Sequence, residues 1–230
     1  MPSEDYTERA RDERDDTFDT DEERDLVDGA DQDAHDDSTA EPEGDAVTFA
    51  SLGLPEEILA AVTDMGFRVP TPIQAAAIPP LLELRDVVGI AQTGTGKTAA
   101  FGLPLLAIVD ADERDVQALV LAPTRELAMQ SAQAIEDFAA RTARLDVVPV
   151  YGGSPYGPQI GALKRGAQVV VGTPGRVIDL IEKGALDLSN VRMLVLDEAD
   201  EMLRMGFAED VETIASSAPD DRLTALFSAT

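Results

Sequence analysis

Several features common in other classes of protein are missing from this chain of 230 residues. Cysteine is absent, which excludes a disulfide framework and any metal site built from thiolates. The start of the chain lacks the basic segment followed by an apolar one that marks a signal peptide. No apolar run is long enough to span a bilayer, because the best candidate, residues 99–109, is short and interrupted by Pro104. We therefore expect a soluble cytoplasmic protein with no membrane partner.

Positive charge is scarce too, and the acidic excess behind the formal net charge of −27 is unevenly distributed. Residues 1–45 contain 20 acidic and 4 basic residues, a charge of −16, and almost no large apolar side chains. Such a segment cannot bury enough apolar surface to offset the entropy lost on folding, so we predict a disordered acidic tail. Residues 46–230 carry the remaining −11, which argues against binding nucleic acid through overall charge and leaves room only for local contacts.

Two metal-binding interpretations of the acidic tail are disfavoured. A calcium-binding loop whose first six residues end at Gly29 would place Arg24 and Leu26 where carboxylates are required. His35 is the single histidine of the chain, and a solvated side chain explains it more simply than a metal ligand does.

Short apolar segments alternate with helical patterns along the rest of the chain. The expected buried strands are residues 87–90, 118–121, 147–150, 169–171, 193–196 and 224–227. Two helices are expected before the first strand, one ending at Gly66 and one ending at Leu82, and later helices are expected at residues 99–109, 125–144, 160–164, 176–183 and 208–217. Near-continuous apolar strands are typical of a parallel sheet covered on both faces. The sequence therefore predicts an α/β domain with a doubly wound parallel sheet over residues 46–230, and ligands at the carboxyl ends of its strands.

Residues 91–98, Ala-Gln-Thr-Gly-Thr-Gly-Lys-Thr, lie between an expected strand and a helix, which is the context of a phosphate-binding loop. Gly94 and Gly96 allow the backbone to curl so that several N–H groups face a phosphate, as does the positive end of the helix dipole. Lys97 adds a charge for the outer phosphates, and the Thr98 hydroxyl is a ligand for Mg²⁺. The candidate nucleotide-binding residues here are Thr93, Gly94, Thr95, Gly96, Lys97 and Thr98. The alternative is a glycine-rich turn that binds nothing.

The strand at residues 193–196 ends in two carboxylates, Asp197 and Glu198. Asp197 is placed to hold Mg²⁺ directly or through water, and Glu198 is placed to polarise the attacking water. An acidic helix N-terminus is the alternative, and it explains Glu201 well. The apolar residues that follow, Met202, Leu203, Met205 and Phe207, are expected in the core.

These segments together resemble the DEAD-box RNA helicases. Residues 197–200 read Asp-Glu-Ala-Asp, the family's signature, and a phosphate loop beginning with Ala91 is the family's version. Residues 66–74 are similar to its adenine-recognising Q motif, and Phe49 lies where the family carries an isolated aromatic residue. Further matches occur in the family's order at residues 123–128, 152–153, 173–176 and 228–230. The resemblance covers residues 49–230, and it also extends to bacterial cold-shock or ribosome-assembly members.

The resemblance implies a RecA-like domain that binds ATP with Mg²⁺. It implies catalytic roles for Lys97, Asp197 and Glu198, with Thr98 and Asp197 at the metal. Gln74 would recognise adenine, since a side-chain amide offers a donor and an acceptor to the N6 and N7 edge of the base. Phe49 would stack on that base, although a core aromatic residue is an equally good reading of Phe49 alone.

The resemblance also implies RNA as a partner, with contacts at Pro123, Thr124, Arg125, Gly152, Gly153, Thr173, Pro174, Gly175 and Arg176. Such contacts reach the RNA backbone and 2′-hydroxyls, so little sequence specificity is expected. Taken singly, each of these motifs is equally an ordinary strand-to-helix turn, and Arg125 has the option of capping its own helix through a nearby acid. The family links hydrolysis to RNA release through residues that match Asp200, Ser228 and Thr230.

Family members continue into a second RecA-like domain, which supplies an arginine finger and the other half of the RNA groove. No arginine follows Arg222 here, so we expect this chain to bind ATP or ADP with Mg²⁺ but to hydrolyse slowly and not to unwind. The leading function is an ATP-dependent RNA helicase that unwinds short RNA duplexes or remodels RNA–protein complexes. The alternative is an ATP-gated RNA-binding clamp without productive unwinding. A third class, another phosphate-loop ATPase acting on protein, is disfavoured by Gln74 and residues 173–176.

Overall fold

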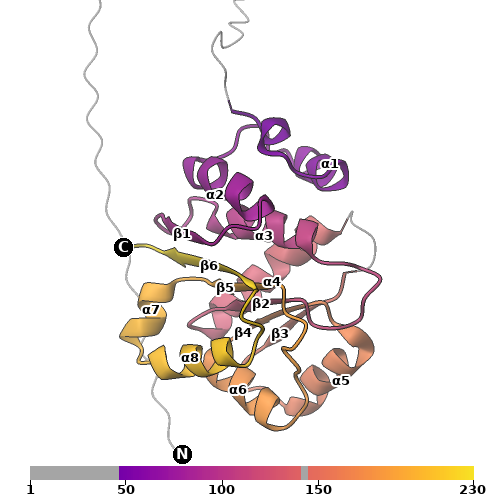
Figure 1. The fold of residues 1–230 in the computed structure, drawn as a ribbon, viewed down its shortest axis with the longest axis vertical. Helices are drawn as coiled ribbons and strands as arrows, with labels where there is room; N and C mark the ends of the chain where they lie inside the picture. The colour runs from indigo at the N-terminus through magenta and orange to yellow at the C-terminus, as the bar shows by residue number, and fades with distance from the viewer. Residues whose placement is uncertain (1–46, 141–144) are drawn as a thin grey trace, which may run out of the picture. The chain divides into compact units, whose positions relative to one another are not determined.

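Six parallel strands form the centre of the computed structural model, which describes residues 47–140 and 145–230 (Figure 1). The strands are β1 (Val87–Ile90), β2 (Ala118–Leu121), β3 (Val147–Val150), β4 (Val169–Gly172), β5 (Met193–Leu196) and β6 (Leu223–Ser228). Their order across the sheet is β1-β6-β5-β2-β4-β3, and every neighbouring pair is parallel. Because all the strands are parallel, the chain must cross over a face of the sheet between one strand and the next.

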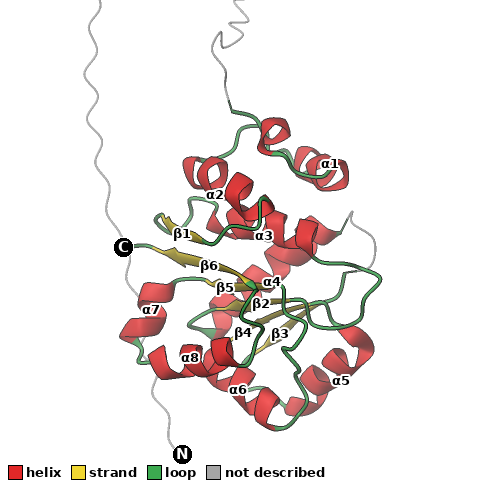
Figure 2. Ribbon diagram, in the orientation of Figure 1, coloured by secondary structure: helices red, strands yellow, loops and turns green. Residues whose placement is uncertain are grey.

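Helices cover both faces of this sheet (Figure 2). One layer packs around a core cluster formed with η1 (Phe49–Leu52), α1 (Glu56–Asp64), α2 (Pro72–Leu82), α3 (Lys97–Ile108) and α4 (Arg125–Ala139). The other layer packs around a second cluster with α5 (Tyr156–Gly166), α6 (Pro174–Glu182), α7 (Ala199–Arg204) and α8 (Ala208–Ser216). Successive side chains of a strand point to opposite faces, so Val120 joins the first cluster while Leu119 and Leu121 join the second.

The predicted α/β fold with a doubly wound parallel sheet is confirmed. The strands β1, β2, β3 and β5 have the predicted bounds, β4 ends one residue later, and β6 is longer by one residue at each end. The short helix α7 was not predicted as a separate element. The predicted disordered tail, with Arg24 and His35, lies outside the described residues, as does the expected helix end at Arg144.

The helix expected at residues 99–109 is present and continues through Pro104. α3 runs from Lys97 to Ile108 with Pro104 inside it, and Pro104 and its neighbours Leu103 and Leu105 are buried. Proline removes one helical hydrogen bond, but tertiary packing of a buried helix supplies most of its stability. No helix among the described residues has both the length and the apolar character required to cross a membrane.

The apolar residues after Asp200 divide between core and surface. Met202 is fully buried, whereas the side chains of Leu203 and Met205 are 64% and 46% exposed. The expectation that all of them are core was therefore wrong for Leu203 and Met205. α7 has fewer than two turns and buries only Ala199 and Met202, so the positions on its other side remain on the surface.

Candidate active site at the carboxyl edge of the sheet

The loop at residues 91–96 connects β1 to α3 in the conformation expected for phosphate binding. Gly94 and Gly96 have φ values of 80° and 87°, in the left-handed region that glycine adopts without strain. The Thr95 hydroxyl donates to the carbonyl of Gln92 at 2.6 Å, which closes the turn. α3 begins at Lys97, directly after Gly96, so its first N–H groups face the inside of the loop. These donors are arranged for an anion such as a phosphate.

The ammonium group of Lys97 forms an ion pair with the carboxylate of Glu198. Lys97 Nζ lies 2.8 Å from Glu198 Oε1, and the two side chains are 5% and 10% exposed. Glu198 has φ = 53°, a conformation uncommon for a residue with a Cβ, and it is the N-cap of α7. Non-glycine residues in this region are enriched at functional sites. The acidic pair thus lies at the start of a helix, as the second interpretation expected, and Glu198 faces the phosphate loop, whereas its roles toward Mg²⁺ and water stay predictions.

Asp197 lies beside this ion pair, at the end of β5, and is 6% exposed. Burial, and next the negative charge of Glu198, raise the pKa of Asp197 to about 6, although Lys97 and Ser131 act in the opposite direction. The Ser131 hydroxyl, from α4, donates to Asp197 Oδ2 at 3.3 Å. The sequence analysis missed Ser131, yet a signal was available, because Ser131 is a polar residue at a position of helical spacing between Ala128 and Ile135.

The donor set fits Mg²⁺ held largely by a nucleotide. Thr98 follows Lys97 in α3, and Asp197 offers a buried carboxylate on the facing strand. Within residues 47–140 and 145–230 there is no group of three or more acidic or histidine side chains that could hold a metal ion by itself. Mg²⁺ commonly binds through one or two protein oxygens together with phosphates and waters, and Thr98 and Asp197 suit that arrangement.

Gln74 connects the segment at residues 66–74, predicted to recognise adenine, to the phosphate loop. Its side chain is 2% exposed. The amide oxygen accepts from the N–H of Thr71 at 2.9 Å, and the amide nitrogen donates to the carbonyl of Gly96 at 3.2 Å. A Cβ at Gly96 would overlap this amide nitrogen, so Gly96 also permits the contact. An amide has two N–H groups and two acceptor lone pairs, so these two contacts use one of each, and the reading of adenine by the others stays a prediction.

Phe49 is packed in the core at 3% exposure, with its ring 6.2 Å from that of Phe67 in an edge-to-face arrangement. Phe67 is the more accessible of the two, at 38% exposure. Packing of Phe49 as a core residue is therefore observed, and its stacking on a base stays a prediction.

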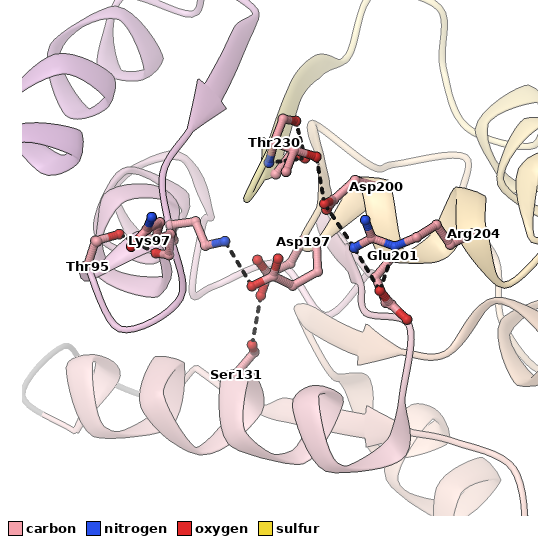
Figure 3. Close-up of polar contacts among 11 residues, drawn as sticks. Thr95, Lys97, Ser131, Asp197, Asp200, Glu201, Arg204 and Thr230 are labelled. Carbon is pink, nitrogen blue, oxygen red and sulfur yellow. Dashed lines mark hydrogen bonds and ion pairs between the residues drawn. The ribbon is translucent and has the colours of Figure 1, made fainter.

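Asp200 and Thr230, predicted to act together, are bonded in the structure. The Thr230 hydroxyl donates to Asp200 Oδ2 at 3.0 Å (Figure 3). Partial burial opposes a lower pKa, but the hydroxyls of Ser228 and Thr230, the N–H of Ala229 and the charge of Arg204 together lower the pKa of Asp200 to about 2. The end of β6 is thereby linked to the start of α7.

Three loops predicted to contact RNA come together at the carboxyl edge. The ends of β2, β4 and β3 are neighbours in the sheet, with Leu121 and Val150 both paired to Gly172. Thr124 and Thr173 are the N-caps of α4 and α6, so these helix N-termini lie at the same edge. The candidate residues differ in accessibility. Arg125, Gly152, Gly153 and Gly175 are exposed, Thr124 and Thr173 are half-buried, and Pro123, Pro174 and Arg176 are buried.

The two arginines of these loops have different surroundings. Arg125 is exposed, and its guanidinium lies 4.8 Å from the ring centroid of Tyr151. Arg176 is 7% exposed, and it donates to the Gln159 side chain and the Ser154 carbonyl, each at 3.0 Å. Arg176 therefore organises the loop after β3 in this structure, whereas Arg125 is open to an incoming phosphate. Direct contact of either arginine with RNA stays a prediction.

Comparison with known proteins agrees with this geometry. The sequence profile described as DEAD/DEAH box helicase matches residues 71–230, which is more than half of the chain. The chain belongs to the DEAD/DEAH box helicase family. The similarity predicted from the ordered motifs is thereby confirmed.

Relatives within the DEAD/DEAH box helicase family include the ATP-dependent RNA helicase DeaD of Haemophilus influenzae, 59% identical over 186 residues. The protein of the same name from Mycobacterium tuberculosis is 57% identical over 189 residues. The alignments cover 81% and 82% of this chain but 30% and 34% of those proteins. The chain thus spans about a third of the length of the curated relatives it matches.

The fold agrees with that of a solved family member. The crystal structure of a DEAD box protein from the hyperthermophile Methanococcus jannaschii matches with a TM-score of 0.74 and 46% sequence identity. The match covers 80% of this chain and 50% of that one. The parallel sheet described here is therefore the family's RecA-like domain.

Proposed function

We propose that this chain is the ATP-binding half of an ATP-dependent RNA helicase, which unwinds short RNA duplexes or remodels RNA–protein complexes. The observation that carries the proposal is the meeting of Lys97 with Glu198, beside Asp197, at the carboxyl edge of the sheet. Relatives named ATP-dependent RNA helicase support it. We assign the activity to residues 46–230, with residues 1–45 as an acidic tail, and place the protein in the cytoplasm. The proposed partners are RNA and a second RecA-like domain.

ATP would bind with its phosphates in the loop of residues 93–98. The N–H groups at the start of α3 and the Lys97 ammonium are suited to the negative charge of the phosphates. Gln74 would read the adenine edge with the hydrogen and lone pair that its contacts to Thr71 and Gly96 leave free. Guanine presents acceptors at both corresponding positions, so GTP should bind less well.

Hydrolysis would use the same side chains in new pairings. The arriving phosphate competes with Glu198 for Lys97, and a Glu198 released from Lys97 is free to accept a hydrogen bond from water. The oxygen of that water forms a bond to the γ-phosphorus while the bond from this phosphorus to the β–γ bridging oxygen breaks, giving ADP and phosphate. Mg²⁺, held by Thr98 and Asp197, would neutralise charge on the phosphates.

RNA would lie along the three loops at the ends of β2, β3 and β4. The exposed glycines let the backbone approach phosphates closely, and Arg125 supplies local charge to an otherwise acidic domain. The bond from Thr230 to Asp200 joins the segment after β6 to the start of α7, close in sequence to Asp197 and Glu198, and hydrolysis would be linked to RNA release through it.

Calorimetric titration of the 230-residue chain tests the nucleotide part of the proposal. We expect heat of binding with ADP or ATP in the presence of Mg²⁺, weaker binding with GTP, and a large loss of affinity in Lys97→Ala. Hydrolysis by this chain alone should be slow. Absence of binding, together with identical behaviour of Lys97→Ala and the parent, would overturn the assignment.

A duplex-displacement assay on a protein that also contains the second RecA-like domain tests the RNA part. ATP-dependent strand release supports the helicase. RNA binding that depends on ATP without strand release would instead indicate an RNA clamp. Rapid ATP turnover that RNA does not alter would indicate an ATPase acting on another substrate.

A further inference from the structure

One buried polar residue of α4 is not explained by packing. The buried face of this helix consists of Ala128, Ser131, Ala132, Ile135, Phe138 and Ala139, among which Ser131 alone is polar. Ser131 is 4% exposed. A buried hydroxyl is unfavourable unless it is hydrogen-bonded, so its choice of partner is informative.

The partner of Ser131 lies outside its own helix. Its hydroxyl donates to Asp197 Oδ2 at 3.3 Å, across 66 residues of sequence (Figure 3). Three threonine and serine hydroxyls of other helices bond within their own helix instead. Thr63, Thr213 and Ser216 each donate to the carbonyl four residues earlier at 2.8 Å. Ser131 thus makes a tertiary contact where a local one is the common alternative.

Asp197 needs such a contact if it is to hold a metal. Its N–H donates to the carbonyl of Leu121 at 2.9 Å, which places the main chain but leaves the side-chain torsions unset. Mg²⁺ requires near-octahedral geometry, so the direction of a carboxylate ligand matters. Partners of metal ligands commonly fix that direction and are themselves important for metal affinity.

We propose that Ser131 is a positioning residue that orients the Asp197 carboxylate for Mg²⁺ bound with a nucleotide. The inference rests on the proposed function, because it needs a nucleotide with Mg²⁺ in this site. Ser131 does not touch the nucleotide, and its effect passes through Asp197. Its loss should therefore weaken the Mg²⁺-dependent part of nucleotide binding and leave the Mg²⁺-independent part unchanged.

The test is calorimetric titration of ADP into the 230-residue chain, first in EDTA and then over a series of Mg²⁺ concentrations. In Ser131→Ala the Mg²⁺ concentration that half-restores tight ADP binding should rise roughly tenfold, while ADP affinity in EDTA stays within about twofold of the parent. Ser131→Thr keeps the hydroxyl and should restore the parent midpoint. Ser216→Ala, which removes a helical hydroxyl from α8, should change neither quantity.

The outcomes separate the positioning role from a packing role. Equal Mg²⁺ midpoints in Ser131→Ala and the parent would overturn the inference, as would equal losses of affinity with and without Mg²⁺. If Ser131→Ala does not fold by circular dichroism, Ser131→Cys preserves the volume with a weaker donor and should show a smaller shift in the same direction. A parent chain that binds ADP equally well with and without Mg²⁺ overturns the inference alone, whereas one that binds no nucleotide overturns the proposed function as well.

Discussion

Lys97 Nζ and Glu198 Oε1 lie 2.8 Å apart, so the cation proposed for phosphate and the carboxylate proposed for water satisfy each other. Both side chains are at most 10% exposed, and a buried charge without a partner is unfavourable. In the proposed function, a bound nucleotide would replace Glu198 as the partner of Lys97. The ion pair satisfies both buried charges in the absence of a phosphate, and its exchange would release the carboxylate for catalysis.

Glu198→Gln should tighten nucleotide binding and abolish hydrolysis. The phosphate then no longer competes with a buried carboxylate for Lys97, so ATP affinity should rise severalfold. Calorimetry with ATP and Mg²⁺ measures the affinity, and phosphate release measures the loss of hydrolysis. Glu201→Gln is the control, because Glu201 pairs with Arg204 on the surface of α7. Weaker ATP binding in Glu198→Gln would contradict the exchange of partners.

Gln74→Ala should weaken ATP binding and narrow the difference between ATP and GTP. Discrimination by a well-placed amide is worth about 1–3 kcal/mol, so the ATP preference should fall by a factor of roughly 5 to 150. Competition between labelled ATP and unlabelled GTP measures the preference for ATP over GTP. Gln74 also bonds to the carbonyl of Gly96, so loosening of the loop alone would weaken both nucleotides equally. An unchanged ATP preference would therefore leave Gln74 as a support of the loop and not as a reader of adenine.

Arg125→Ala should alter RNA binding and leave stability nearly unchanged, whereas Arg176→Ala should lower stability. Arg125 is exposed, so its removal should leave stability nearly unchanged and reduce the salt dependence of RNA binding by about one phosphate contact. Arg176 is buried and bonded to Gln159 and to the Ser154 carbonyl, so its removal should destabilise the domain by about 1–3 kcal/mol. Urea unfolding and a salt series of RNA binding measure the two effects. A large loss of stability in Arg125→Ala would show that its contact with Tyr151 is structural.

Asp200→Asn should lower the free energy of unfolding at neutral pH. The difference from the parent should become smaller in acid. The pKa of Asp200 is lowered from 3.8 to about 2, so the folded chain favours the ionised carboxylate. The resulting stability is present above pH 3.8 and is lost as the pH falls through about 2. The difference in urea unfolding between the parent and Asp200→Asn should thus be larger at pH 7 than at pH 3. An equal difference in unfolding free energy at pH 7 and pH 3 would show that ionisation of the Asp200 carboxylate is not the cause of the stability loss.

The order of elements and the positions of the motifs could be read from the sequence, because both are local properties. Apolar segments of four residues bounded by turn residues predict buried strands, and β2, β3 and β5 have those bounds. A glycine-rich turn between a strand and a helix places residues 91–98 at the carboxyl edge wherever the strand lies in the sheet. Membership of the family followed from motifs whose order needs no structure.

The pairings within the site were decided only by tertiary structure. Lys97 and Glu198 are 101 residues apart, and Gln74 and Gly96 are 22 apart, so no local pattern links them. The sequence alone suggested equal roles for Arg125 and Arg176, but packing of α6 against the loop after β3 buries one and leaves the other exposed. Chain patterns determine which residues reach an edge of the sheet. Strand order, register and side-chain packing determine which of them touch, because a hydrogen bond depends on distances of a few tenths of an ångström.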